Sequence, residues 1–163
     1  MILRCLNRID LDQIRIERNK DISGFRTPYL IIDQAKFWDL VIDANKSRYF
    51  AIQEDDLFVG YCGLYPISWE NSSAEVSLHI FENYRKSGKG SLAFKKLVEV
   101  AFNQMNLNII YGECYKNNPG AVKFWEKQKK VYKYFKESIL PDRKYWDGYY
   151  YDSYYFSINR KLL

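Results

Sequence analysis

The chain has 163 residues, of which 47% are hydrophobic and 18% aromatic, and it carries a formal net charge of +5. This length supplies one sizeable hydrophobic core but not two ordinary domains, so we expect a single domain over residues 1–163. The sequence holds no run of about 18 apolar residues, and we expect no membrane partner. The mild basic charge favours anionic ligands without indicating nucleic acid, which we do not expect as a partner.

The three cysteines, Cys5, Cys62 and Cys114, are odd in number and lack the spacing of a metal site. Two of them lie in apolar, strand-like runs, where free cysteine behaves as a small hydrophobic residue. The N-terminal residues MILRCLNRID are too charged for a signal peptide. These features predict reduced cysteines, no metal and a cytoplasmic location.

The N-terminal half predicts two helices and four strands. Leu11–Arg18 and Ile32–Ala44 have apolar residues at helical spacing, and Asp10 and Asp33 are their candidate N-caps. Four runs bounded by turn residues predict strands: Met1–Leu6, Tyr49–Gln53, Leu57–Pro66 and Ala74–Phe81. We expect the second and third of these strands to form an antiparallel hairpin.

In the C-terminal half, Gly90–Gln104 has a strong helical period, Asn108–Cys114 reads as a buried strand, and Pro119–Lys127 as a helix with proline in its first turn. Two late strands are expected at Val131–Ile139 and Tyr149–Ile158, separated by the turn-rich segment LPDRKYWDG. The resulting order predicts one α/β domain, in which antiparallel hairpins surround a single parallel βαβ step.

Between the fourth strand and the long helix, residues 84–94 read YRKSGKGSLAF. Glycines let successive backbone N–H groups point at one anion, and the start of a helix adds its positive dipole. Three basic side chains in the same stretch, Arg85, Lys86 and Lys89, add positive charge. We therefore predict a phosphate-binding loop.

Three phosphate motifs compete for this loop. The P-loop pattern is absent. Gly88–Ala93 matches the dinucleotide pattern G-x-G-x-x-A, and Glu113 follows as its acid, but the antiparallel hairpins upstream argue against a doubly wound fold. The third pattern, R-x-x-G-x-G at Arg85–Gly90, suits a pyrophosphate. A dinucleotide-binding protein is kept as an alternative.

The third pattern resembles the GNAT superfamily of acyl-CoA-dependent N-acetyltransferases. The strand AEVSLHI, the turn FENY, the loop Arg85–Gly90 and the later segment NPGAVKFW follow one another with the gaps of that family. The resemblance implies a GNAT fold, with a mixed central sheet of about seven strands flanked by about four helices. It also implies acetyl-CoA as the donor and direct attack by an acceptor amine in a ternary complex.

In the family, the pyrophosphate of coenzyme A lies on the loop and the pantetheine arm pairs with the preceding strand. The residues that the resemblance implies as cofactor-binding are Leu78, His79, Ile80, Arg85, Lys86, Ser87, Gly88, Lys89, Gly90, Ser91, Asn118 and Phe124.

The resemblance also supplies candidate catalytic residues. Glu75 stands where many family members have a general base, and His79 on the same strand face is a second candidate because histidine titrates near neutrality. The alternatives are a surface carboxylate and a packing histidine. Trp125 replaces the family tyrosine that protonates the thiolate, and an indole N–H is not a practical proton source. Lys129 and the next lysine replace the usual Gly-Phe, and either meet the 3′-phosphate of coenzyme A or end the helix in solvent.

The acceptor is indicated only by short segments. Arg18 and Asn19 resemble an element of the RimJ/RimL-like branch and of amino-sugar-nucleotide N-acetyltransferases, as does the segment GYYYD with Tyr149 and Tyr151. We take these four residues as candidate substrate contacts, with Arg15 or Arg26 as further cations. A small amine or amino-sugar nucleotide is the expected acceptor. A protein N-terminus and a non-catalytic CoA-binding module are the alternatives, and the tyrosine-rich strand is compatible with a homodimer.

Overall fold

The computed structural model describes residues 1–20 and 28–160. Its strands form one seven-stranded sheet in the order β1-β2-β3-β4-β5-β7-β6, and within the described residues β4 and β5 are its one parallel pair. In chain order the elements are β1 (Ile2–Cys5), α1 (Asp10–Lys20), α2 (Ile31–Ile42), β2 (Arg48–Glu54), β3 (Leu57–Ser68), β4 (Ser73–Ile80), a 3₁₀ turn (Glu82–Tyr84), α3 (Lys89–Glu99), a π-helical turn (Val100–Gln104), β5 (Ile109–Tyr115), α4 (Pro119–Val131), β6 (Phe135–Trp146) and β7 (Tyr149–Asn159). The predicted element order and mixed sheet are confirmed.

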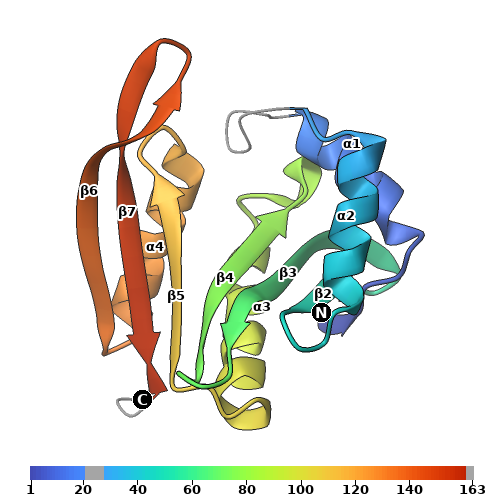
Figure 1. Cartoon of the computed structure of the whole chain (residues 1–163), viewed down its shortest axis with the longest axis horizontal. Coiled ribbons are helices and arrows are strands. Elements are labelled where there is room, and N and C mark those ends of the chain that lie inside the picture. Colours follow the sequence, from blue (N-terminus) through green and yellow to red (C-terminus); the bar gives the residue numbers. More distant parts are fainter. Residues whose placement is uncertain (21–27, 161–163) are drawn as a thin grey trace.

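Helices cover both faces of the sheet (Figure 1). On one face, α3 supplies the buried side chains Phe94 and Leu97, which pack with Ile110 of β5 and Ile158 of β7. On the other face, α1 and α2 cover β2 and β3, where a smaller core includes Leu11, Ile14, Ala51, Tyr61 and Phe81. None of the described helices is both long and apolar enough to cross a membrane.

The strand β4 divides its side chains between these two faces. Ala74 is fully buried and Val76, Leu78 and Ile80 pack against the same core, on the side of α3. Because side chains alternate along a strand, Glu75, Ser77 and His79 lie on the opposite face. The apolar and the chemically active residues of β4 are thereby separated by the sheet itself.

The strands β4 and β5 pair only at their beginnings. Their register runs from Ser73 opposite Ile109 to Glu75 opposite Tyr111, and stops there. From that point the two strands move apart toward their C-terminal ends (Figure 1). The separation leaves a cleft, here called the β4–β5 cleft, between Val76–Ile80 and Gly112–Tyr115.

Three predicted boundaries are wrong. Asp10 is the first residue of α1 and its carboxylate instead accepts from the Asn7 N–H at 2.7 Å. The N-cap of α2 is Leu30, and Asp33 caps from inside the helix by accepting the Leu30 N–H at 3.0 Å. Here the charged side chains satisfy N–H groups outside the helix rather than within its first turn.

The late strands differ most from the prediction. The helix α4 continues to Val131, and most of the segment expected as a turn belongs to β6. The strand tolerates Pro141 because it lies at the edge of the sheet, with a register shift between Leu140 and Lys144. The actual turn is Asp147-Gly148, where both residues have positive φ.

Candidate active site

The backbone of the glycine loop is shaped to receive an anion. Gly88 is the N-cap of α3 with φ of 82°, in the left-handed region where glycine carries no steric penalty, and Lys86 also has positive φ, 61°. No described side chain caps the helix, so the first-turn N–H groups of Lys89, Gly90 and Ser91 have no side-chain cap. A helix start of this kind stabilises phosphate oxygens through both hydrogen bonds and its dipole.

Side chains fix the loop in place. Arg85 donates from Nε to the Ile80 carbonyl at 2.9 Å, and the Ser87 hydroxyl donates to the Tyr84 carbonyl at 2.6 Å. The Lys89 ammonium forms an ion pair with Glu54 at the end of β2. The loop is therefore tied to β4 and β2, while its amide groups point elsewhere.

The buried amide of Gln128 connects the loop region to α4, because its Nε2 donates to the Ser91 hydroxyl at 3.1 Å. Beside this contact, a groove of about 490 Å³ lies between α3 and α4, and its lining includes Leu92, Lys95 and Val131. A partly apolar groove with a lysine next to a pyrophosphate loop suits the adenosine part of coenzyme A.

The register of β4 shows which backbone groups face the β4–β5 cleft. The Phe81 N–H donates to the Val59 carbonyl of β3 at 3.0 Å, so the main-chain groups of Ser77 and His79 also face β3. Those of Val76, Leu78 and Ile80 therefore face the cleft. Of the three residues expected to pair with the pantetheine arm, Leu78 and Ile80 present their backbone to the cleft, whereas His79 does not.

The predicted cofactor residues from three elements converge at Gly90. A Cβ added there would lie 3.6 Å from both Ile80 Cγ1 and Phe124 Cε2, so the loop, β4 and α4 meet at this point. Asn118 caps α4, accepting the Ala121 N–H at 3.1 Å, so its oxygen already has a structural partner. The open amides, the unpaired strand edge and the adjoining groove together fit coenzyme A.

Glu75 lies at the narrow end of the cleft and has a second carboxylate nearby. It is half-buried, and burial, followed by the charge of Glu113, raises its pKa from the ordinary value. Tyr111 is its register partner on β5, and burial followed by the charge of Glu75 raises the pKa of that phenol. A carboxylate with a raised pKa is suited to accept a proton from an amine near neutral pH.

Glu113 has its own polar partners. The hydroxyl of Ser153 donates to it, and Arg143 Nε lies 3.8 Å from its Oε1. Because Tyr155 is its register partner on β7, that ring shares the same sheet face. The sequence analysis did not select Tyr111, Glu113 or Tyr155 as acceptor residues, although the period-2 alternation on β5 places the first two on one face.

His79 packs among aromatic rings. Its ring centroid lies 5.5 Å from that of Tyr61 and 6.1 Å from that of Phe81, next to the core that α1 and α2 cover. Tyr61 is buried, which raises the pKa of its phenol. The role of His79 as a base stays a prediction, and Glu75 is the better placed of the two beside the opening of the cleft.

The candidate substrate residues on α1 hold the start of α2. Asn19 Oδ1 accepts the Tyr29 N–H at 2.6 Å and its Nδ2 donates to the Tyr29 carbonyl at 3.0 Å. The Arg18 guanidinium lies 3.9 Å from the centre of the Tyr29 ring. Arg15 donates to Gln34 at 2.9 Å, whereas Arg26 lies outside the described residues.

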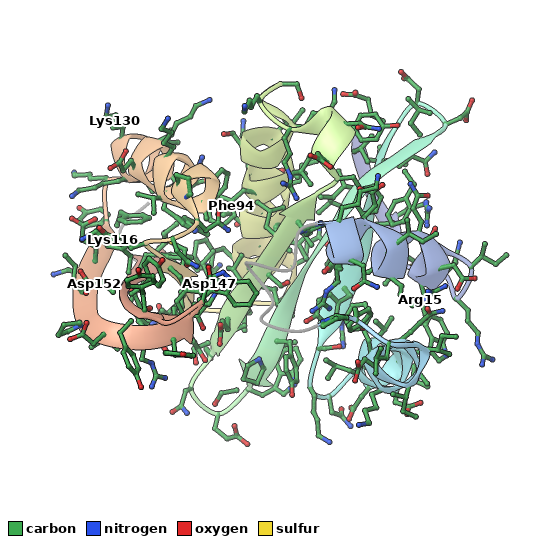
Figure 2. The ribbon with its side chains drawn as sticks, turned by 90° about the horizontal axis from the view of Figure 1, so that it is seen from above. Arg15, Phe94, Lys116, Lys130, Asp147 and Asp152 are labelled. Carbon is green, nitrogen blue, oxygen red and sulfur yellow. The ribbon has the colours of Figure 1, made fainter. Side chains whose placement is uncertain are left out.

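The two candidate tyrosines of β7 lie in different surroundings. Tyr149 is 68% exposed at the β6–β7 turn, whereas Tyr151 is half-buried and pairs with Lys144. Figure 2 shows Asp152 beside Lys116, its ion-pair partner at 3.4 Å, on the β5–β7 side, with Arg15 on the opposite side. The predicted substrate residues therefore come from two separate walls of the molecule.

Trp125 belongs to the core rather than to the cleft. Its ring stacks on Phe156 with centroids 3.4 Å apart and packs edge-on against Phe94 and Phe124, at 5.0 and 4.7 Å. The lysine that follows at position 129 pairs with Glu137. The position of the missing tyrosine is thus filled by a packing residue, and the indole is not placed to serve as an acid.

The fold and site together define an acyltransferase of the GNAT type. The model of the acetyltransferase (GNAT) family matches residues 13–129, more than half of the chain, and the chain belongs to this family. It is an acyl-CoA-dependent N-acetyltransferase whose donor is acetyl-CoA. The dinucleotide alternative is therefore set aside.

Named relatives come from bacteria. An uncharacterized N-acetyltransferase, p20, of Bacillus licheniformis is 28% identical over 141 residues, covering 83% of this chain and 77% of that protein. A spermidine N(1)-acetyltransferase of Vibrio cholerae is 27% identical over 131 residues, covering 77% and 76%. A solved chimera of the spermidine N-acetyltransferase SpeG from Vibrio cholerae and hSSAT superposes with a TM-score of 0.83 at 25% identity, covering 99% of this chain and 97% of that one.

Proposed function

We propose that this enzyme acetylates a primary amine of a small polycationic molecule such as spermidine, by direct attack in a ternary complex. The observation that carries the proposal is the pair of carboxylates Glu75 and Glu113 on the sheet face that α1 and α2 leave uncovered beside the cleft. Two nearby carboxylates attract ammonium groups and hold one of them close to the base.

The chemistry follows from the positions of the chain's own groups. Acetyl-CoA supplies an activated thioester carbonyl. Glu75 takes a proton from the acceptor ammonium, so that the free amine forms the new C–N bond as the C–S bond breaks. The backbone N–H of Leu78 faces the cleft and is suited to hold the oxyanion. Since Trp125 is packed in the core, the departing thiolate takes its proton from water.

An amino-sugar nucleotide fits this cleft less well. Its diphosphate would need cations on the acceptor side, yet Arg15 and Arg18 make contacts between α1 and the segment at the start of α2. Two of the similar proteins carry spermidine in their names, which supports a polyamine. A protein N-terminus has one ammonium group and would use only one of the two carboxylates.

An acceptor panel tests the proposal through release of the thiol of coenzyme A. Spermidine, spermine, a UDP-linked amino sugar and a peptide with a free N-terminus are compared at matched concentrations. We expect the highest kcat/KM with the polyamines, and expect Glu113→Gln to raise the polyamine KM more than it lowers kcat. Highest turnover of the sugar nucleotide or the peptide would refute the proposal.

A further inference from the structure

Two consecutive asparagines follow β5, and the structure gives them different surroundings. Asn118 caps α4 through its Oδ1, which accepts the Ala121 N–H at 3.1 Å. The Oδ1 of Asn117 is buried and, among the described residues, accepts a hydrogen bond from no group. Helix capping therefore occupies the family asparagine and leaves its neighbour with an unused acceptor.

Asn117 is held at the wide end of the β4–β5 cleft. The Asn118 N–H donates to the Tyr115 carbonyl at 2.9 Å, and the Lys116 N–H donates to the Asp152 carbonyl at 3.0 Å. These bonds fix the turn on both sides of Asn117, directly after the last residue of β5. The turn thus forms the wall of the cleft opposite the cleft-facing edge of β4.

A buried carbonyl oxygen without a donor is unfavourable, and such groups are rare in folded proteins. A ligand that brings a donor to this oxygen recovers the missing hydrogen bond. Phosphate oxygens are acceptors and cannot do so, whereas the pantetheine arm of coenzyme A carries amide N–H groups. We infer that Asn117 Oδ1 accepts a hydrogen bond from an amide of the pantetheine arm and so is a cofactor-binding residue. The inference rests on acetyl-CoA as the donor and is independent of which amine is acetylated.

Binding of two ligands to the whole protein tests the inference without any amine present. Coenzyme A has the arm, and 3′,5′-ADP has the nucleotide and phosphate without it. Asn117→Leu keeps the approximate side-chain volume and removes the acceptor. We expect this variant to bind coenzyme A roughly two- to tenfold more weakly than the wild type, to bind 3′,5′-ADP equally well, and to melt higher without ligand.

The matched control is Asn118→Ala, which removes the helix cap and should lower the melting temperature of the unliganded protein. If leucine does not fit, Asn117→Ala repeats the comparison with a smaller side chain. Unchanged coenzyme A binding in the variant that folds would overturn the inference, as would an equal loss of affinity for 3′,5′-ADP. Both results are readable even if polyamines prove not to be the acceptors.

Discussion

Replacing Gly90 with alanine should stabilise the protein and weaken its cofactor binding. Gly90 lies in the first turn of α3, and its φ lies outside the positive range that strains other residues. A Cβ there would meet Ile80 and Phe124 at 3.6 Å, an ordinary van der Waals contact. Because alanine is favoured over glycine in a helix by about 1 kcal/mol, the unliganded variant should melt roughly 2–4 °C higher.

The same methyl group would occupy space between the loop, β4 and α4, where the cofactor is expected. At about 100 times its Kd, acetyl-CoA should stabilise the wild type by about 2.7 kcal/mol, and a tenfold loss of affinity would reduce this to about 1.4 kcal/mol. Thermal melting with and without acetyl-CoA measures both effects. Gly88→Ala is the control, since its φ of 82° should make alanine unfavourable by about 1 kcal/mol. A Gly90→Ala protein with the full acetyl-CoA shift would refute the position of the cofactor.

Three further predictions concern charge and proton transfer. Glu75→Gln should abolish most activity yet be more stable than the wild type at pH 7; because the folded pKa is raised above 4.5, this advantage should vanish below that pH in melts across a pH series. Glu113→Gln should move the acid limb of the pH–rate profile to lower pH, since the charge of Glu113 helps to raise the pKa of Glu75, and an unmoved limb would contradict the coupling. Glu54→Gln should release Lys89 and tighten coenzyme A binding by about two- to fivefold in calorimetry, whereas weaker binding would show that the ion pair is needed to position the loop.

Trp125→Phe adds a fourth prediction. It should lower stability by about 1 kcal/mol through lost ring packing and leave the alkaline limb unchanged, which a shifted limb would refute.

The parts of the site that depend on local pattern could be predicted from the sequence. The alternation of β4 separates Glu75 from Val76, and the glycines mark the loop, because both depend on a few adjacent residues. The extent of β6 could not be predicted, since Pro141 is tolerated only at a sheet edge. The ion pair between Glu54 and a lysine 35 residues away was also beyond local pattern.

The cleft itself was the other feature that local reasoning missed. That β4 and β5 separate after Glu75 depends on how α3 and α4 pack beneath them, and no residue of either strand signals it. The capping of α4 by Asn118 follows from its position before Pro119, a recognisable helix start. The burial of Asn117, in contrast, depends on contacts that only the folded chain makes.

Residue-resolved amide hydrogen exchange with and without acetyl-CoA tests the central claim most directly. If the pantetheine arm lies along β4, the amides of Leu78 and Ile80 should gain protection, together with the first turn of α3. The amides of Ser77 and His79, whose backbone groups already face β3, should change little. Protection confined to other parts of the chain, with Leu78 and the start of α3 unchanged, would contradict the account.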